Sequence, residues 1–221
     1  LGNRPVDLVD LSVAIDAAAT AVASLAPIDN PASAPGTTLS GVMVLRTAEG
    51  PYWLSFNVGD SRVYVVGGGG IRQLTHDHSA LQEARDLAAA SGAPRVIPPA
   101  NVVTKALGAG QTGSVKADYT IMPLEEGDRA VICTDGVHGV LRDSQIHAVV
   151  AGGDGPQGTA DTLVRASLES GTRDNTTAVV VYAGTQSRVT LTTNVMNRMI
   201  QPVRPASIQT ARRVPRREGS D

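Results

Sequence analysis

The stretch RAVICTDGVHGVL, residues 129–141, decides how this chain folds. Its first part, Ala130–Cys133, is a continuous apolar run typical of a buried strand. The strand is followed by Asp135, with Gly136 directly behind it. We therefore predict a strand anchored in a sheet that carries a carboxylate at its exposed end, where the glycine lets the backbone turn away.

The rest of the chain alternates between strand and helix patterns. Short runs of apolar and β-branched residues predict antiparallel strands joined by tight turns, over residues 38–46, 52–58, 59–75, 115–134 and 176–184. The last turn of this kind is acidic, at 124–128. Helical spacing of apolar residues predicts helices, over residues 6–25, 76–90, 143–151 and 159–169. Hairpins with segregated helices indicate an α+β domain of packed antiparallel sheets, not a parallel βαβ fold.

Two of these helices carry specific expectations. The first is expected to bury the apolar residues that recur near the helical period, namely Val6, Val9, Val13, Ala17 and Ala21. The second has Asp77 or Ser79 available as its N-cap and Gly92 as its stop.

The composition is that of an ordinary globular protein. The chain has 221 residues, of which 42% are hydrophobic and 18% charged, enough to bury one sizeable core. The single Cys133 excludes a disulfide framework and is expected to be a small buried hydrophobe, which favours a reducing compartment. No apolar run is long enough to span a bilayer, and the N-terminus does not have the pattern of a signal peptide. A cytoplasmic protein without a membrane span is therefore predicted.

Charge divides the chain into two parts. Residues 186–221 carry seven Arg against two acidic residues, a balance of +5, so residues 1–185 carry −7 of the total of −2. We predict a folded domain over 1–185 and a basic, disordered tail over 186–221. The tail is interpreted as a solvated linker, and no nucleic-acid partner is expected. Contact of ARRVPRR, 211–217, with an anionic surface or a partner is the alternative.

Three other motifs have plain structural explanations. GAGQTG, 108–113, matches a dinucleotide-binding pattern but does not have the required strand before it and helix after it. The glycines 67–70 fit a hairpin better than a phosphate-binding loop, which needs a helix to follow. The histidines of HDH, 76–78, cannot share one helical face, so a helix cap by Asp77 is favoured over a metal site. Two further histidines have no evident partner and are expected at the surface, His138 and His147.

Three aspartates stand out because each lies at the junction of a strand and a turn. Asp60 lies between two strands, Asp135 follows one, and Asp174 precedes one. Asp is common in turns, which explains any single one of them. If the strands bring all three together, their charges repel and raise their pKa values unless a cation lies between them. Mg²⁺ or Mn²⁺, hard ions that prefer oxygen ligands, would relieve this repulsion.

Several motifs occur in an order that is characteristic of a known family. They are GTTL (36–39), NVGDSRVYVV (57–66), IRQLTHDHS (71–79), VVTKALG (102–108), LEEGDRAVICTDGVHGVL (124–141) and GTRDNTTAVVVY (171–182). With these motifs the chain, from about Val6 to Ala183, resembles the bacterial metal-dependent protein serine/threonine phosphatases of the 2C type, the PPM family.

The resemblance implies a fold and an activity. The fold is a four-layer α-β-β-α sandwich, in which two antiparallel sheets lie between helices. The activity is hydrolysis of phosphoserine and phosphothreonine in proteins by a water molecule that Mn²⁺ or Mg²⁺ activates, with two ions and in some members a third. Phosphorylated proteins are then the expected partners, together with a cognate Ser/Thr kinase.

Matched residue by residue, the resemblance assigns roles to the three aspartates. It makes Asp135 and Asp174 metal ligands and catalytic residues, and Asp60 a ligand, with Asp135, of the weaker third ion. Asn175 would brace its neighbour, and Arg62 would be structural and not a phosphate ligand.

Other positions refine what the resemblance implies. Residues 88–101 would correspond to the flap beside the cleft, and Gly139 replaces a further Asp of some members, which predicts a loosely held third ion. The family's opening strands, with an Asp-Gly-Met-Gly-Gly type motif whose Asp bridges both metals, have no counterpart before Val6. We therefore expect an N-terminally incomplete sandwich that is inactive or weak by itself. A non-catalytic, phosphatase-like regulatory or binding module is the alternative function.

Overall fold

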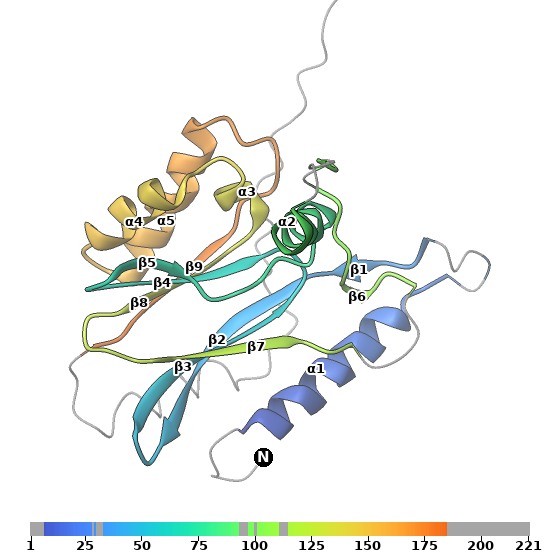
Figure 1. The fold of residues 1–221 in the computed structure, drawn as a ribbon, viewed down its shortest axis with the longest axis horizontal. Helices are drawn as coiled ribbons and strands as arrows, with labels where there is room; N and C mark the ends of the chain where they lie inside the picture. The colour runs from blue at the N-terminus through green and yellow to red at the C-terminus, as the bar shows by residue number, and fades with distance from the viewer. Residues whose placement is uncertain are drawn as a thin grey trace, which may run out of the picture. The chain divides into compact units, whose positions relative to one another are not determined.

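Two antiparallel β-sheets stacked face to face form the middle of the fold, and helices cover their outer faces (Figure 1). In spatial order, the first sheet consists of β2 (Leu39–Thr47), β3 (Gly50–Val58) and β7 (Asp118–Pro123). The second sheet consists, in spatial order, of β5 (Gly70–Gln73), β4 (Arg62–Gly67), β8 (Arg129–Cys133) and β9 (Ala178–Tyr182). A short ladder lies beside the first helix and joins β1 (Gly36–Thr37) to β6 (Leu107–Gly108).

The structure is a computed structural model that describes residues 7–27, 29, 33–92, 97–99, 101–110 and 115–184. All of these belong to one compact unit, Leu1–Gly184. Within this part of the chain, no helix is both long enough and apolar enough to cross a membrane. The predicted tail, 186–221, lies outside the described residues, as do parts of the predicted flap and of the GAGQTG motif.

Three apolar clusters hold the layers together. The cluster between the sheets contains side chains from both of them, chiefly Val42, Trp53, Val63, Val65 and Ala130. Outside the first sheet, α1 (Leu8–Ala23) packs on Leu39, Phe56 and Val58. Outside the second sheet lie three helices, α3 (Asp135–His138), α4 (Asp143–Ala151) and α5 (Pro156–Glu169). The predicted four-layer α-β-β-α sandwich is thereby confirmed.

The face that α1 buries differs from the predicted one. Ile15 and Ala19 are buried, whereas Val9 and Val13 are 70% and 62% exposed. A second stripe at helical spacing, which includes Leu11, faces the first sheet instead. The helix was predicted correctly, but the sequence offers two apolar stripes and only the contact with the sheet selects between them.

Strand β8 lies between β4 and β9 and is covered on both faces. Val131 and Cys133 face the helices, while Ala130 and Ile132 face the first sheet. This double burial explains why the strand is continuously apolar from Ala130 to Cys133 instead of alternating. Burial raises the pKa of the Cys133 thiol to about 12, in keeping with the predicted role of a small buried hydrophobe.

Most of the remaining predicted elements are present. The turns Ala48–Glu49 and Gly68–Gly69 close the hairpins β2–β3 and β4–β5, so the four glycines form a hairpin as predicted. Helix α2 (Ala80–Ser91) begins after the N-cap Ser79 and ends at Gly92, whose φ of 65° suits glycine.

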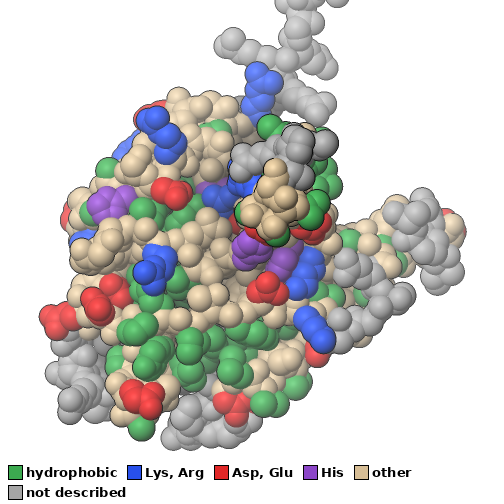
Figure 2. Space-filling model, in the orientation of Figure 1, with side chains coloured by type: hydrophobic (Ala, Val, Ile, Leu, Met, Phe, Trp, Pro, Cys, Tyr) green, Lys and Arg blue, Asp and Glu red, His purple; other side chains and the backbone are tan. Residues whose placement is uncertain are grey.

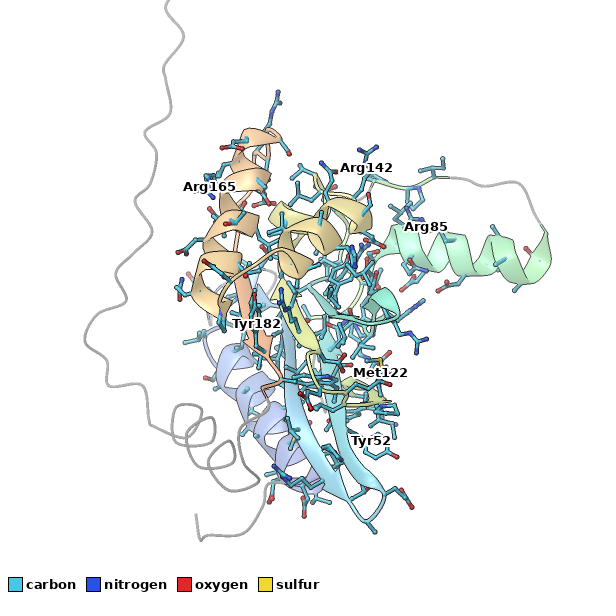
Figure 3. All side chains as sticks on the ribbon, turned by 90° about the vertical axis from the view of Figure 1, so that its left-hand side faces the viewer. Tyr52, Arg85, Met122, Arg142, Arg165 and Tyr182 are labelled. Atoms are coloured by element: carbon cyan, nitrogen blue, oxygen red, sulfur yellow. The ribbon has the colours of Figure 1, made fainter. Side chains whose placement is uncertain are left out.

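Arg129 joins the second sheet to the helices above it. Its Nη1 donates to the main-chain oxygens of Ala151 and Gly153, at 3.0 and 3.1 Å, next to the C-terminal end of α4. The guanidinium lies 4.4 Å from the ring centroid of Tyr182, which Figure 3 labels on β9. The Tyr182 hydroxyl is hydrogen bonded to Thr159 Oγ1 of α5 at 2.6 Å. These contacts fix the helices at the end of β8 that is opposite to Asp135.

The acidic turn Leu124–Asp128 connects the two sheets and does not close a hairpin. β7 pairs with β3 and β8 pairs with β4, so the strands on either side of the turn belong to different sheets. The buried carboxylate of Asp128 accepts hydrogen bonds from Trp53 Nε1 at 3.0 Å and from the N–H of Glu125 at 2.9 Å. Asp128 thus ties the crossing between the sheets to the first sheet.

Replacing Asp128 should weaken this crossing. Asp128→Ala is expected to lower the free energy of unfolding by about 2–3 kcal/mol, because the buried indole N–H of Trp53 and the N–H of Glu125 lose a charged acceptor. Urea unfolding followed by the emission of Trp53, the single tryptophan, measures the change. Glu126→Ala, an exposed change in the same turn, should alter stability by less than about 0.5 kcal/mol. Equal stability of the two variants would contradict the role of Asp128.

Candidate functional site

Asp135 is the first residue of α3, and only the N-cap Thr134 separates it from the end of β8 at Cys133. The strand therefore delivers the carboxylate to its end as predicted, but the backbone does not swing away freely at Gly136. Gly136 is buried within α3, and a Cβ on it would lie 2.4 Å from the main-chain oxygen of Asn175. The glycine is needed for close packing against the loop of Asp174, not for flexibility.

Asp60 lies in the turn between β3 and β4, and this turn is held tightly. Gly59 has a φ of 112°, and a Cβ on it would lie 2.3 Å from Cγ2 of Thr38. The N–H of Gly59 donates to His78 Nδ1 at 3.0 Å. The oxygen of Gly59 accepts from the N–H of His78 and from Asn57 Nδ2, each at 2.9 Å.

The other side of the turn is bound to the first sheet through Ser61. Ser40 Oγ of β2 lies within hydrogen-bonding distance of two acceptors for its one proton, Asn57 Oδ1 and the main-chain oxygen of Ser61, the latter at 3.0 Å. Thr38 Oγ1 and Ser61 Oγ are hydrogen bonded at 3.0 Å. Asp60 is therefore carried by a turn whose neighbours on both sides are anchored to β2 and β3.

The charges of Asp60 and Asp135 act on each other. Burial is the main cause that raises the pKa of Asp60, and the negative charge of Asp135 is the next. Both residues are partly buried, so water screens the pair less than it would at a fully exposed site. Two half-buried carboxylates that repel each other form a place where a cation is favoured.

Arg62 takes part in a buried ion pair close to the Asp60 turn. Its Nη2 lies 2.6 Å from Asp77 Oδ2, and its Nε donates to both oxygens of Asp77 at 2.9 and 3.0 Å. Its Nη1 donates to the hydroxyl of Tyr64 at 2.9 Å, and Gln73 Nε2 donates to Asp77 Oδ1 at 3.1 Å. The structural role expected for Arg62 agrees with these contacts.

The HDH motif has a different explanation from the predicted one. Asp77 does not cap α2, because its carboxylate is bound to Arg62, and Ser79 Oγ accepts the N–H of Gln82 instead. His76 is hydrogen bonded to the exposed Asp86. His78 contacts the Asp60 turn through Nδ1 and lies 3.1 Å from Asp118 Oδ2 through Nε2.

His138, expected at the surface, contacts the candidate site. Its Nε2 is hydrogen bonded to the main-chain oxygen of Asp60 at 3.0 Å, and the side chain is partly buried. Burial lowers the pKa of His138, and the positive charge of Arg62 lowers it further. The expectation of a surface residue was wrong, since the partner lies 78 residues away in the sequence. The signal available in the sequence was its position one helical turn after Asp135.

Asp174 lies in the loop between α5 and β9 and is exposed. Its Oδ1 accepts the N–H of Asn175 at 2.7 Å. The residues that follow it pack against the start of α3, where Thr134 donates to the oxygen of Asn175 and accepts the N–H of Thr177, at 3.3 and 3.1 Å. The loop thus reaches the segment that carries Asp135. The Asp174 side chain itself is exposed to solvent.

A divalent ion fits the Asp60–Asp135 pair. Mg²⁺ is commonly held by one or two carboxylates and completes its shell with water and substrate oxygens, and carboxylates also suit Mn²⁺. Among the described residues, however, no three His, Cys, Asp or Glu side chains are grouped closely enough to hold a metal ion. The structure therefore brings together two of the three predicted ligands, and the third lies on an adjoining loop.

A series of charged and imidazole side chains begins at the Asp60 turn with His78. Figure 2 shows histidine, acidic and basic side chains close together beside α2. Asp118 Oδ1 accepts from Lys105 Nζ at 3.0 Å, while Asp118 Oδ2 faces His78. Sequence reasoning missed these residues because their partners come from separate segments.

Curated relatives match about two thirds of the chain. No protein-family model matches it. It is 29% identical over 149 residues to protein phosphatase PhpP of Streptococcus pneumoniae, and 27% identical over 147 residues to serine/threonine phosphatase stp of Listeria welshimeri. Each match covers 66% of this chain but only 57% and 56% of the relative. The chain thus spans a little over half the length of the curated relatives it matches.

Solved structures extend the likeness to most of the described fold. The chain is 30% identical to the PPM Ser-Thr phosphatase MsPP from Mycobacterium smegmatis, with a TM-score of 0.63, over 80% of this chain and 75% of that one. It is 26% identical to the catalytic domain of the serine threonine protein phosphatase PstP in complex with two manganese ions, with a TM-score of 0.66, over 80% and 73% of the two chains.

An α-β-β-α sandwich with carboxylates at one end of its sheets defines a 2C-type phosphatase fold. The similarity to MsPP shows to which family the chain belongs. The chain belongs to the PPM family of serine/threonine phosphatases.

Removing the charge of Asp60 should stabilise the metal-free protein. Because the pKa of Asp60 is raised in the folded chain, its charged form costs stability above that pKa, and the cost fades as the pH falls toward the ordinary pKa of Asp. Asp60→Asn is therefore expected to raise the melting temperature at pH 7 by about 1–4 °C, with a smaller gain near pH 4. Melting in a chelator measures it, with Asp161→Asn on the exposed face of α5 as control. A lower melting temperature at pH 7 would refute the repulsion.

Proposed function

We propose that the protein is a metal-dependent phosphatase that hydrolyses phosphoserine and phosphothreonine in proteins. The observation that carries the proposal is the pair Asp60 and Asp135, two half-buried carboxylates beside the end of a buried strand. The names of the relatives support the substrate class, since MsPP is a Ser-Thr phosphatase and PhpP a protein phosphatase.

The aspartates are proposed as the ligands. Asp135 and Asp174 would hold a pair of Mn²⁺ or Mg²⁺ ions, and Asp60 would share with Asp135 a third, more weakly held ion. The two manganese ions bound by PstP support this choice of metal. When bound, such ions lower the pKa of a water molecule and polarise phosphoryl oxygens, so that the water can attack phosphorus directly.

The chain's own residues orient the ligands. The pairing of β8 with both of its neighbours fixes the backbone before Asp135. Gly136 allows the Asn175 main chain to approach, which brings the Asp174 loop to the same end of the sheet. Arg62 stays bound to Asp77, so it organises the base of the site and is withheld from the substrate phosphate.

We also propose that the 221-residue chain by itself turns over slowly or not at all. Two-metal hydrolysis needs carboxylate ligands for both ions. The described residues bring together the pair of Asp60 and Asp135 and no group of three. We further propose a cognate Ser/Thr kinase that supplies the phosphoprotein, and a cytoplasmic location.

Hydrolysis of a phosphothreonine peptide tests the function. The protein translated from the whole reading frame should release phosphate with Mn²⁺ and not in a chelator, and the 221-residue chain should be much slower. Asp135→Asn in the longer protein is expected to reduce the rate at least about 100-fold, because loss of a direct ligand should exceed the about 10–100-fold effect of losing an outer partner. Full activity in the chelator would contradict metal dependence.

Matched controls separate the site from the fold. Asp161→Asn removes an exposed carboxylate of α5 and should leave the rate unchanged. Rapid Mn²⁺-dependent turnover by the 221-residue chain would overturn the proposed weakness of this chain alone. A longer protein that binds Mn²⁺ or phosphopeptide without turnover would instead favour the non-catalytic binding module. The described residues contain no group of three metal-ligating side chains, which supports this alternative.

A further inference from the structure

One short helix carries Asp135 and is hydrogen bonded to the main chain of Asp60. Asp135 and His138 are the first and last residues of α3. Residues three apart lie about one helical turn apart, on one side of a helix. His138 Nε2 is hydrogen bonded to the main-chain oxygen of Asp60 at 3.0 Å. Since a carbonyl oxygen can only accept, the proton of the imidazole lies on Nε2 and His138 is the donor.

The hydrogen bond from His138 opposes a repulsion. Asp60 and Asp135 carry like charges at the same end of the β4–β8 ladder, so their carboxylates repel each other. The last ladder pair of β4 with β8 is Arg62 with Cys133, and both carboxylates lie two residues beyond it. A tether beyond the ladder is therefore needed to keep them together.

The other contacts of the turn do not supply that tether. The hydrogen bonds to Gly59 and Ser61 come from β2, β3 and the residues next to them, and from His78. Among the described side chains that bond to residues 59–61, His138 is the one that belongs to α3. Within the described part of the chain, its hydrogen bond is the one that connects the backbone of Asp60 to the helix that begins with Asp135.

We propose that His138 is a positioning residue, which holds Asp60 beside Asp135 and thereby sets the affinity of the pair for a divalent cation. This role rests on the proposed function, because it presumes that the pair holds a metal ion.

Equilibrium binding of Mn²⁺ alone tests the role, with free Mn²⁺ measured by its electron paramagnetic resonance signal. Loss of an outer partner of a metal ligand typically lowers metal affinity about 10–100-fold. His138→Leu removes the donor at similar size and is expected to weaken Mn²⁺ binding about tenfold. His138→Gln, whose Nε2 can donate from a similar place, should recover most of the affinity. His147→Leu in α4 is the matched control and should bind as the unaltered chain does.

A double-mutant cycle shows whether His138 acts through Asp60. In an Asp60→Asn background, His138→Leu should change the Mn²⁺ affinity by less than about twofold, because the carboxylate it positions is gone. Thermal melts of each variant establish that it is folded. The amide ¹⁵N shift of Ser61, which shares a peptide group with the Asp60 oxygen, should move in His138→Leu and not in His147→Leu.

The outcomes separate this role from the proposed function. If the unaltered chain binds Mn²⁺ and folded His138→Leu binds it equally well, the role of His138 is overturned and the metal site stands. An equal loss of affinity with and without Asp60 also overturns it. If the unaltered chain binds no Mn²⁺ at all, both the metal site and this role are overturned.

Discussion

The antiparallel pairing of β8 between β4 and β9 is the constraint on which the rest of the site depends. In an antiparallel ladder, the start of one strand lies beside the end of its neighbour. Arg62 at the start of β4 and Ala178 at the start of β9 both pair with Cys133 at the end of β8. The segments that carry Asp60, Asp135 and Asp174 therefore meet where these strands end, on one side of the second sheet, although they are far apart in sequence.

Charged side chains gather at these strand ends, where the backbone that carries them is held firmly by packing and hydrogen bonds. The strand behind Asp135 is apolar on both faces, while the turn of Asp60 rests on hydrogen bonds from serine, threonine, asparagine and histidine. Beneath it, the Arg62–Asp77 pair has its charges matched and its hydrogen-bonding groups extended to Tyr64 and Gln73. At this end of the sheet, Asp60 and Asp135 are half-buried carboxylates of like charge, an arrangement typical of a functional site.

The sequence predicts those features that depend on residues close together in the chain. The continuous run of β8, the hairpin turns and the Ser79 and Gly92 boundaries of α2 follow from period, β-propensity and turn chemistry. The placement of Asp60 and Asp135 was foreseen because both follow or precede strands. His138 and Asp77 were misjudged because their partners are set by strand register over long separations. The phase of α1 was misjudged because two apolar stripes were present and only tertiary packing distinguishes them.

The crossing at Asp128 also bears on how the molecule assembles. Trp53 and Asp128 are separated by 75 residues, and Asp60 and His138 by 78, so these contacts close long loops. Contacts of such sequence separation form late and slow the folding of β-rich domains. The helices α4 and α5 can form locally, yet they contain neither carboxylate of the pair. A partly folded chain therefore has no cation site, and the appearance of that site reports that both sheets have closed.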